Sequence, residues 1–512
     1  MRRGLLLPSA FCLLPFLVAC TSVQPASTRF KILQLNDVYK IEGLEKGQLG
    51  GLARVRTLRK QLEADGSAVL LLHAGDALYP SVASKYLEAR PIVDVMNLLD
   101  GDAERFDPAL IVGFGNHEFD NKEANLLISR IADSQFQWLA TNTKQCVESR
   151  CERGFARTQE TLVYEVGGTR IGLFGVLYPL KKTYAESSDV IAAAKYAVSQ
   201  LRRQRADIII GITHQNLRDD IQMVRDVEGV DLVIGGHDHI FLQERVGDTW
   251  ITKADADAKS VVVYEVECAL RCTVSDPRRV MLDTTVPKDE TVDARVEEWM
   301  ETLARELGGN ETLGTAKYLL EGVEPAIRGR ETALGNLLTD IAREQMGTDV
   351  GLLNGGSIRI NDNIPPGPVT EYEMEGIFYY TNRLVAFPLT GRQLLDMLNI
   401  SVKDADSADG RFLQVSGLRF AYTKRGDTFT VDAADVTVGG KPLDLDKTYS
   451  VASTDFMHER GAEDDYVIFA SEATRPPRIH TDREADFRTT VEKAIRARGT
   501  IDTNVEGRIV RR

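Results

Sequence analysis

The sequence has fewer basic than acidic residues, few cysteines and no long hydrophobic run after its first twenty residues. Its 512 residues carry a formal net charge of −14, which argues against a nucleic-acid backbone as a partner. A small anionic substrate stays possible, because metal ions and a few arginines can reverse the field inside a cleft. No segment after the amino terminus reaches the roughly 18 apolar residues of a membrane span. With 43% hydrophobic and 27% charged residues, the composition is that of a globular protein long enough for two or three domains.

The amino terminus differs from the rest of the chain. Two arginines precede an apolar run over 5–18, which is typical of a secretory signal. The residues that end at Cys20 resemble a bacterial lipoprotein signal, in which the cysteine is lipidated; the alternative is an ordinary signal with a chance cysteine. Ser22 resembles outer-membrane sorting. We therefore expect a signal peptide over 1–20 and an exported protein that meets the membrane only through a lipid anchor, placed in the outer membrane.

Beyond Cys12 and Cys20, the cysteines form two close pairs. These pairs are Cys146 with Cys151 and Cys268 with Cys272. An exported protein meets oxidising conditions, so two local disulfides are expected. A zinc site is the alternative, although neither pair has the usual spacing of zinc ligands.

The chain alternates apolar runs with helical stretches up to about residue 285. Strands are predicted over 30–35, 68–72, 110–112, 138–140, 170–176, 207–212 and 231–234. Several are continuous runs of Val, Ile and Leu, which suit strands buried on both faces of an α/β domain. We predict this domain over 29–286, a charged helical connector within 287–314, and a smaller α/β domain over 315–512.

Polar residues follow these predicted strands where each strand ends. In chain order they are Asp37, Asp76, Asn116, His117, His214, His237 and His239. Ligands of open α/β sheets bind at this carboxyl edge. Carboxylate, imidazole and amide oxygen suit Zn, Mn or Fe, and two such ions about 3.5–4 Å apart shield an anionic phosphate ester and lower the pKa of a bound water. Asp76 is the expected bridge between two ions, because it stands between a glycine and a loop.

The ordered set resembles the calcineurin-like metallophosphoesterases, and the sequence Gly-Asn-His-Glu-Phe-Asp that ends at Asp120 resembles their 5′-nucleotidase branch. The resemblance implies a four-layer αββα sandwich and two metal ions (Zn, Mn, Mg or Fe). It assigns one ion to Asp76, Asn116, His214 and His237, and the other to Asp37, Asp76 and His239. It also implies that His117 faces the phosphate, with Asp120 orienting its ring, and such a pair can donate to developing negative charge. Glu118 is expected to be structural.

The first motif departs from the family, which usually has Asp-x-His where this chain has Asp37-Val38-Tyr39. Three interpretations stay open. The site tolerates three protein ligands; or Tyr79, in a Gly-Asp-x-x-Tyr that resembles purple acid phosphatases, fills the gap; or the site is weak. Tyr39 itself is expected to be a packing residue.

The second domain carries a further set that resembles the C-terminal domain of 5′-nucleotidases. The resemblance implies polar contacts to a nucleotide from Arg330, Asn354, Arg359 and Asn382, and stacking of the base between Tyr380 and Phe456. Asp464 is the nearest candidate for a ribose contact. Stacking tolerates different bases, so broad nucleobase acceptance is expected.

The leading hypothesis is a dimetal-dependent enzyme that hydrolyses 5′-nucleotides to nucleoside and phosphate. A second hypothesis keeps the metal centre but changes the substrate to 2′,3′-cyclic nucleotides, nucleotide sugars or dinucleotides. A third is a nucleotide-binding lipoprotein without activity, which only the missing first-motif histidine supports.

Overall fold

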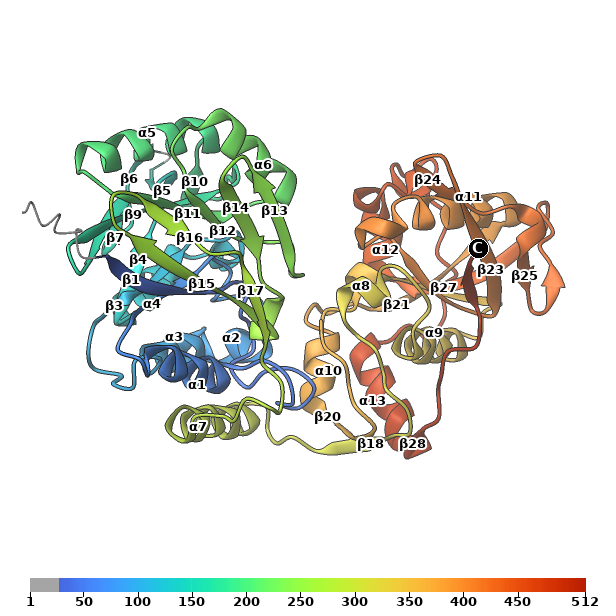
Figure 1. Cartoon of the computed structure of the whole chain (residues 1–512). Coiled ribbons are helices and arrows are strands. Elements are labelled where there is room, and N and C mark those ends of the chain that lie inside the picture. The colour runs from blue at the N-terminus through green and yellow to red at the C-terminus, as the bar shows by residue number, and fades with distance from the viewer. Residues whose placement is uncertain (1–26, 149) are drawn as a thin grey trace, which may run out of the picture.

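The computed structural model describes residues 27–148 and 150–512, and Figure 1 shows two lobes that follow one another along the chain. The predicted signal peptide and Cys20 lie outside the described residues. Within the described part, none of the helices combines the length and the apolar character that a bilayer crossing requires.

The first lobe is built on two stacked sheets. One sheet has the order β16 (Cys272–Val274), β15 (Ser260–Cys268), β1 (Thr28–Leu35), β2 (Ala68–His73), β3 (Asp107–Gly113), β4 (Phe136–Leu139), β7 (Thr158–Gln159), with β17 (Arg278–Met281) on β15. The other has the order β13 (Leu242–Val246), β14 (Thr249–Lys253), β12 (Leu232–Gly236), β11 (Ile208–His214), β9 (Thr169–Leu177), β8 (Thr161–Val166). From β1 to β4 in the first sheet and from β9 to β12 in the second, neighbouring strands are parallel.

Helices cover the outer face of each sheet. Against the first sheet lie α1 (Leu52–Glu63), α3 (Arg90–Asn97) and α4 (Ala124–Asp133), while α2 (Val82–Leu87) packs on α3. Against the second sheet lie α5 (Val190–Arg203) and α6 (Leu217–Asp226). Between the sheets, side chains such as Ile32, Leu70, Ile210 and Leu232 form one buried core. These strands are apolar on both faces because each face meets a layer. The predicted four-layer αββα sandwich is confirmed.

The helix expected as a connector is α7 (Glu290–Glu306). It packs on α1, α2 and α3, and its Val292 and Val296 are buried in the core beneath them. The helix thus extends the outer helical layer of the first lobe, and the chain crosses to the second lobe after it.

The second lobe is also α/β. Its strands form the orders β20 (Gly367–Thr370), β18 (Thr312–Ala316), β28 (Thr500–Ile501); β21 (Leu384–Thr390), β27 (Thr448–Thr454), β19 (Val350–Asn354), β22 (Leu413–Ser416); and β24 (Thr428–Thr430), β23 (Leu418–Arg425), β25 (Val436–Val438), β26 (Lys441–Pro442), with β29 (Ile509–Arg511) on β23. Its helices include α8 (Glu324–Ile327), α9 (Ala333–Met346), α10 (Glu371–Ile377), α11 (Gly391–Val402), α12 (Asp455–Arg460) and α13 (Phe487–Arg498). The segment 413–422 divides between two sheets at Gly417, where φ is 70°.

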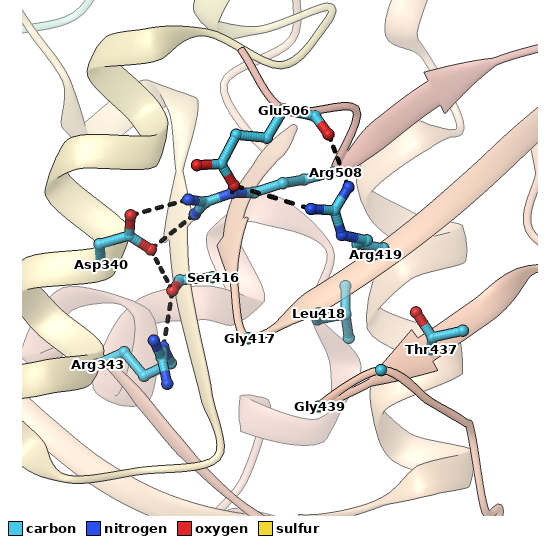
Figure 2. A pocket seen from close by; sticks show the side chains of 11 residues that line it. Asp340, Arg343, Ser416, Gly417, Leu418, Arg419, Thr437, Gly439, Glu506 and Arg508 are labelled. Atoms are coloured by element: carbon cyan, nitrogen blue, oxygen red, sulfur yellow. Dashed lines mark hydrogen bonds and ion pairs between the residues drawn. The ribbon is translucent and has the colours of Figure 1, made fainter. Parts of the chain in front are cut away.

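The last residues of the chain are tied to α9. Arg508 makes a two-pronged ion pair with Asp340 at 2.7 and 2.8 Å, and Glu506 pairs with Arg508 at 3.1 Å (Figure 2). The buried carboxylate of Glu331 accepts hydrogen bonds from the backbone N–H groups of Glu506 and Arg508. Glu331 therefore fixes the carboxyl-terminal strand to the start of α9.

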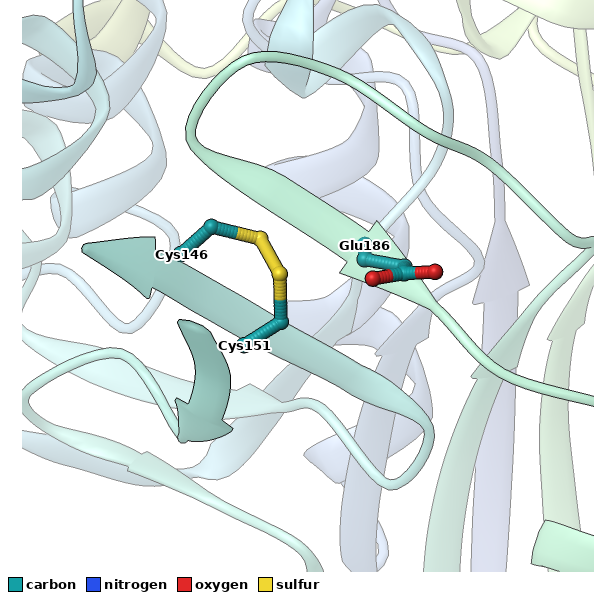
Figure 3. Close-up of side chains that lie close together, drawn as sticks. All are labelled: Cys146, Cys151 and Glu186. Carbon is teal, nitrogen blue, oxygen red and sulfur yellow. A yellow bond between two sulfur atoms is a disulfide. The ribbon is translucent and has the colours of Figure 1, made fainter. Parts of the chain in front are cut away.

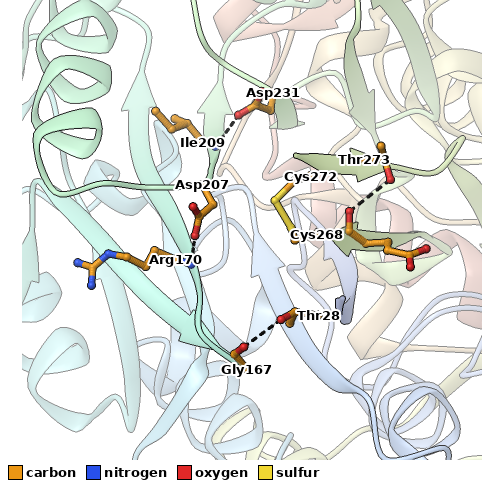
Figure 4. Close-up of a disulfide and its surroundings, with 10 residues drawn as sticks. Thr28, Gly167, Arg170, Asp207, Ile209, Asp231, Cys268, Cys272 and Thr273 are labelled. Carbon is orange, nitrogen blue, oxygen red and sulfur yellow. Dashed lines mark hydrogen bonds between the residues drawn. A yellow bond between two sulfur atoms is a disulfide. The ribbon is translucent and has the colours of Figure 1, made fainter. Parts of the chain in front are cut away.

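Both predicted disulfides are confirmed. Cys146 is bonded to Cys151 in the hairpin of β5 (Thr143–Val147) and β6 (Arg150–Arg153), near Glu186 (Figure 3). Cys268 is bonded to Cys272 where β15 turns into β16 (Figure 4). Because each sulfur is held in a disulfide, the alternative zinc site lacks its thiolates.

Candidate active site

The polar residues singled out in the first lobe meet at one edge of the two stacked sheets. Asp37 follows β1, Asp76 follows β2, and Asn116 follows β3, while His214 ends β11 and His237 follows β12. Parallel strands place their carboxyl ends on the same side, so stretches far apart in sequence converge here.

At the centre of this edge, Asp37, Asp76 and His214 each offer one atom within 4.8 Å of the other two. The Nε2 atom of His214 lies 3.1 Å from Asp76 and 4.0 Å from Asp37. His239 joins them, with Nε2 at 3.5 Å from Asp37. All but His239 are buried, so the cluster is a compact, water-poor set of carboxylates and imidazoles.

The donor inventory of this cluster fits a metal ion. His214 donates Nδ1–H to the carbonyl of Ala74 at 2.7 Å, which turns its Nε2 lone pair toward the carboxylate of Asp76. The Oδ1 atom of Asn116 is buried without a hydrogen-bond partner. Acceptors that face acceptors in a buried site need a cation between them, and a backbone bond on the far nitrogen is how ligating histidines are oriented.

The pKa values of Asp76 and His214 show that the cluster favours positive charge. Burial alone would raise the pKa of Asp76, but His214 and His117 hold it well below its usual range. Burial would lower the pKa of His214, yet the charge of Asp76 raises it to about 9. The carboxylates thus hold a positive charge at His214 that a metal ion can replace.

Four of the predicted ligands adopt a left-handed backbone: Asp37, Asp76, His237 and His239 have φ values of 52°, 57°, 83° and 60°. Non-glycine residues rarely do so, and such strain gathers at functional sites.

The loop of Asp76 is stabilised by Glu118. Its carboxylate accepts the N–H groups of Gly115 at 2.5 Å and Asp76 at 3.0 Å. Gly115 is required there, since a Cβ would lie 2.1 Å from an oxygen of Asp76. Glu118 is therefore structural, as expected from sequence.

His237 lies beside this cluster. Its ring centre is 5.2 Å from that of His214, and its backbone N–H donates to Asp37 at 3.0 Å. Burial and the neighbouring His214 lower its pKa to about 4, which leaves the imidazole neutral and able to ligate.

His117 and Asp120 form the predicted pair. The Nδ1 atom of His117 is 2.6 Å from Asp120, and its Nε2 is 4.0 Å from Asp76. Burial lowers the pKa of His117, but the charge of Asp76 and the bond to Asp120 raise it above its ordinary value. An imidazole oriented by Asp120 therefore stands beside the cluster.

Tyr39 and Tyr79 lie in surroundings opposite to those expected from sequence. Tyr39, expected only to pack, places its hydroxyl 3.2 Å from Asp76 and 3.1 Å from Nε2 of His239. The hydroxyl of Tyr79 is buried in the helical layer without a hydrogen-bond partner, where burial raises its pKa to about 12. The structure does not bring Tyr79 to the cluster.

In the second lobe, Arg330 does not lie where expected. It pairs with Glu321, and its side chain is 55% exposed. Arg328, two residues earlier, is 15% exposed and pairs with Glu324, in the field of Arg359 and Asp464. Arg328 and Glu324 were not among the residues predicted from sequence, although Arg328 is only two residues from Arg330.

Of the remaining predicted substrate residues, Arg359 and Asp464 lie close to Arg328. Asn354 donates to Asp464 at 2.8 Å. The guanidinium of Arg359 lies 5.7 Å from the ring centre of Tyr380, which is 53% exposed. Phe456 is the second residue of α12 and is half-buried beneath Arg460. Asn382 lies two residues after Tyr380, and its backbone carbonyl accepts a hydrogen bond from the backbone N–H of Phe487.

One carboxylate connects the two clusters. Glu324 of the second lobe lies 3.5 Å from Nδ1 of His239 and pairs through its other oxygen with Arg328. Further contacts join the lobes nearby, among them the ion pair of Lys40 with Asp362 at 3.0 Å. We call Asp37, Asp76, His214 and His239 the metal-type cluster, and Arg328 with Arg359 the arginine cluster. The two clusters form one continuous polar region.

Comparisons with known proteins agree with this geometry. Residues 30–241 match the calcineurin-like phosphoesterase family and residues 312–470 match the 5′-nucleotidase, C-terminal domain. The chain is 26% identical to a snake venom 5′-nucleotidase of Gloydius brevicauda, over 96% of this chain and 90% of that protein. It is 26% identical to a human 5′-nucleotidase, over 90% of this chain and 85% of that protein. A 5′-nucleotidase precursor from Thermus thermophilus shares the fold, with a TM-score of 0.73 at 24% identity over 94% of this chain and 99% of that one.

The stacked sheets with their carboxyl-edge cluster are those of a metallophosphoesterase. With its second lobe, the chain belongs to the 5′-nucleotidase family.

Proposed function

We propose that this protein hydrolyses 5′-nucleotides to nucleoside and phosphate, using two metal ions. The observation that carries the proposal is the continuity of the two clusters through Glu324, 3.5 Å from His239 and paired with Arg328. A ligand that spans this region meets carboxylates and imidazoles at one end and arginines with aromatic rings at the other, which matches a phosphate joined to a nucleoside.

The residues that would hold the ions fall into two sets. Asp76, Asn116, His214 and His237 would form one, and Asp37, Asp76 and His239 the other. When bound, such ions (Zn, Mn, Mg or Fe) neutralise the charge of the phosphate and activate a water. Two observations support these assignments: Oδ1 of Asn116 has no hydrogen-bond partner, and Nε2 of His214 faces Asp76.

His117 would stabilise the reacting phosphate. Asp120 holds its Nδ1 proton at 2.6 Å, which leaves Nε2–H directed toward the cluster, where it can donate to the negative charge that develops on the leaving oxygen. This role is supported by the raised pKa of His117, because a protonated ring is needed to donate.

The second lobe would select the nucleotide. Arg328 and Arg359 supply positive charge close to the metal-type cluster, and Asn354 with Asp464 offers hydrogen bonds that suit a ribose. Tyr380 and Phe456 would stack on the base. Stacking recognises the flat ring rather than its substituents, so several bases should be accepted.

We also propose that the protein is exported and anchored in the outer membrane through a lipid on Cys20. The two disulfides support an oxidising compartment. A Cys20→Ser variant should then move from the membrane fraction to the soluble fraction; an unchanged membrane-bound pool would contradict the anchor.

The function is tested with a substrate panel. The mature protein, stripped with chelator and reloaded with Mn²⁺, Zn²⁺ or Fe, is assayed for phosphate release from AMP, a 2′,3′-cyclic nucleotide and a nucleotide sugar. We expect AMP to have the highest kcat/KM. Preference for one of the other substrates would reassign the specificity, and absence of turnover with every metal would contradict the proposed activity.

A further inference from the structure

Tyr39 stands at the position where the family usually has a metal-binding histidine, and its ring is held firmly in place. The backbone N–H groups of Tyr39 and Lys40 both donate to Asp257, at 2.8 and 2.9 Å. The ring makes edge contacts with the rings of His117 and His239. The hydroxyl is thereby directed into the cluster and is not free to choose another partner.

Three side chains of the proposed metal set surround this hydroxyl. Its oxygen lies 3.1 Å from Nε2 of His239, 3.2 Å from Asp76 and 3.5 Å from Asp37. Both carboxylates are acceptors, and a phenol has one proton to donate. Oxygen atoms that gather with an imidazole nitrogen around one buried point match the arrangement of ligands around a cation.

We propose that the phenolic oxygen of Tyr39 is a ligand of the ion held by Asp37, Asp76 and His239, and that this set selects a trivalent ion, ferric iron. The inference rests on the proposed metal centre. On binding, the O–H bond of Tyr39 breaks, the proton leaves to solvent and the oxygen bonds to the ion, with no change of oxidation state. Asp37 and the phenolate then supply two negative charges to this ion, and Asp76 shares a third with the neighbouring ion, so the set is rich in anionic oxygen and suits a trivalent ion.

The neighbouring set differs in chemistry. Asp76, Asn116, His214 and His237 offer the shared carboxylate, one amide oxygen and two imidazoles, a set richer in nitrogen that suits a divalent ion such as Zn²⁺ or Fe²⁺. The two positions therefore prefer different charges, and the centre takes a mixed pair of ions rather than two of one kind.

The test compares two single-hydroxyl deletions, Tyr39→Phe and Tyr79→Phe, in mature protein loaded with ferric iron. We expect the unaltered protein and the Tyr79→Phe variant to show a phenolate-to-iron charge-transfer band in visible absorption, with tyrosinate modes in resonance Raman spectra. The Tyr39→Phe variant should lose both signals and bind ferric iron at least about tenfold more weakly. Iron per chain is measured by elemental analysis and folding by circular dichroism.

A band that survives in Tyr39→Phe, iron bound without a band, or no uptake of ferric iron by the unaltered protein would each overturn the proposal. A Tyr39→His variant guards against loss of folding, since it restores the family's ligand and should bind two ions without colour. AMP hydrolysis with Mn²⁺ is measured on the same preparations. Hydrolysis without a band refutes only the role of Tyr39, whereas a band without hydrolysis refutes only the proposed function.

Discussion

The two halves of the candidate site are held in different ways. In the first lobe, Asp37, Asp76 and His214 are buried, and backbone groups fix the loops that carry them. In the second lobe, Tyr380 is 53% exposed, and Arg328 is neutralised by Glu324 rather than by backbone. One half has its geometry set before any ligand arrives, while the other exposes groups that can exchange partners.

This difference suggests that the first lobe stabilises the reacting phosphate and the second lobe selects the nucleotide. A preorganised, water-poor cluster is what stabilisation of charge requires. Exposed rings and paired arginines can adjust to the ligand, and they contribute binding energy more than rate. Changes in the first lobe should therefore affect every phosphate ester, whereas changes in the second should affect only nucleotides.

The largest effect is expected from Asp76→Asn. It removes the carboxylate shared by both sets, so kcat/KM should fall by about 10⁴-fold on AMP and on p-nitrophenyl phosphate alike, a loss of roughly 5 kcal/mol. Phosphate release and metal content per chain measure it, with circular dichroism as the check on folding. If the variant kept both ions and its activity, the role of Asp76 as the shared ligand, and with it the contrast between the lobes, would be contradicted.

His117→Ala should lower kcat by about 10³-fold, because the group that donates to the leaving oxygen is lost. Metal content should stay unchanged, which distinguishes this variant from the previous one. Asp120→Asn should have a smaller effect in the same direction, since it alters only the orientation of the ring. Unchanged turnover in His117→Ala would contradict the assignment.

Tyr380→Ala and Phe456→Ala test the other side of the comparison. Loss of one stacking partner costs about 1–3 kcal/mol, so KM for AMP should rise about tenfold to 100-fold. The p-nitrophenyl ester carries no base, and its kinetics serve as the internal control. Equal losses on both substrates would show that the rings support the metal cluster rather than the nucleotide.

The smallest effect is expected from a matched arginine pair. Arg328→Gln should raise KM for AMP about tenfold, because a charged hydrogen bond to the substrate is lost. Arg330→Gln, which removes an exposed ion pair with Glu321, should leave the kinetics unchanged. The reverse result would restore the assignment made from sequence.

Sequence alone predicted the layers and the composition of the metal-type cluster well. Strand apolarity shows burial on both faces, and each polar residue directly follows its strand, so convergence at one edge follows from topology. The short strands β13, β16 and β17 were missed, and they are partly exposed and carry mixed residues. The largely buried strands β14 and β15 were missed as well.

Contacts between lobes could not be predicted, because they depend on the arrangement of two folded bodies. The approach of Glu324 to His239 has no signal in local sequence. The choice between Arg328 and Arg330 depends on the end of the short helix α8, which turns one side chain inward and the other out. The direction of Tyr39 follows from the left-handed turn at Asp37 and the bonds of Asp257, which no pattern reveals.

The final strand of the chain has a practical consequence. Glu331, next to Arg330, is held by the backbone of residues 506–509, well beyond residue 470, where the family match ends. Clipping the last few residues by a protease, or fusing a bulky tag close behind them, would unseat Glu331 and loosen the turn that aims Arg328. Weakened nucleotide affinity in a trimmed or tagged preparation would then reflect damage at the chain end, not a property of the intact enzyme.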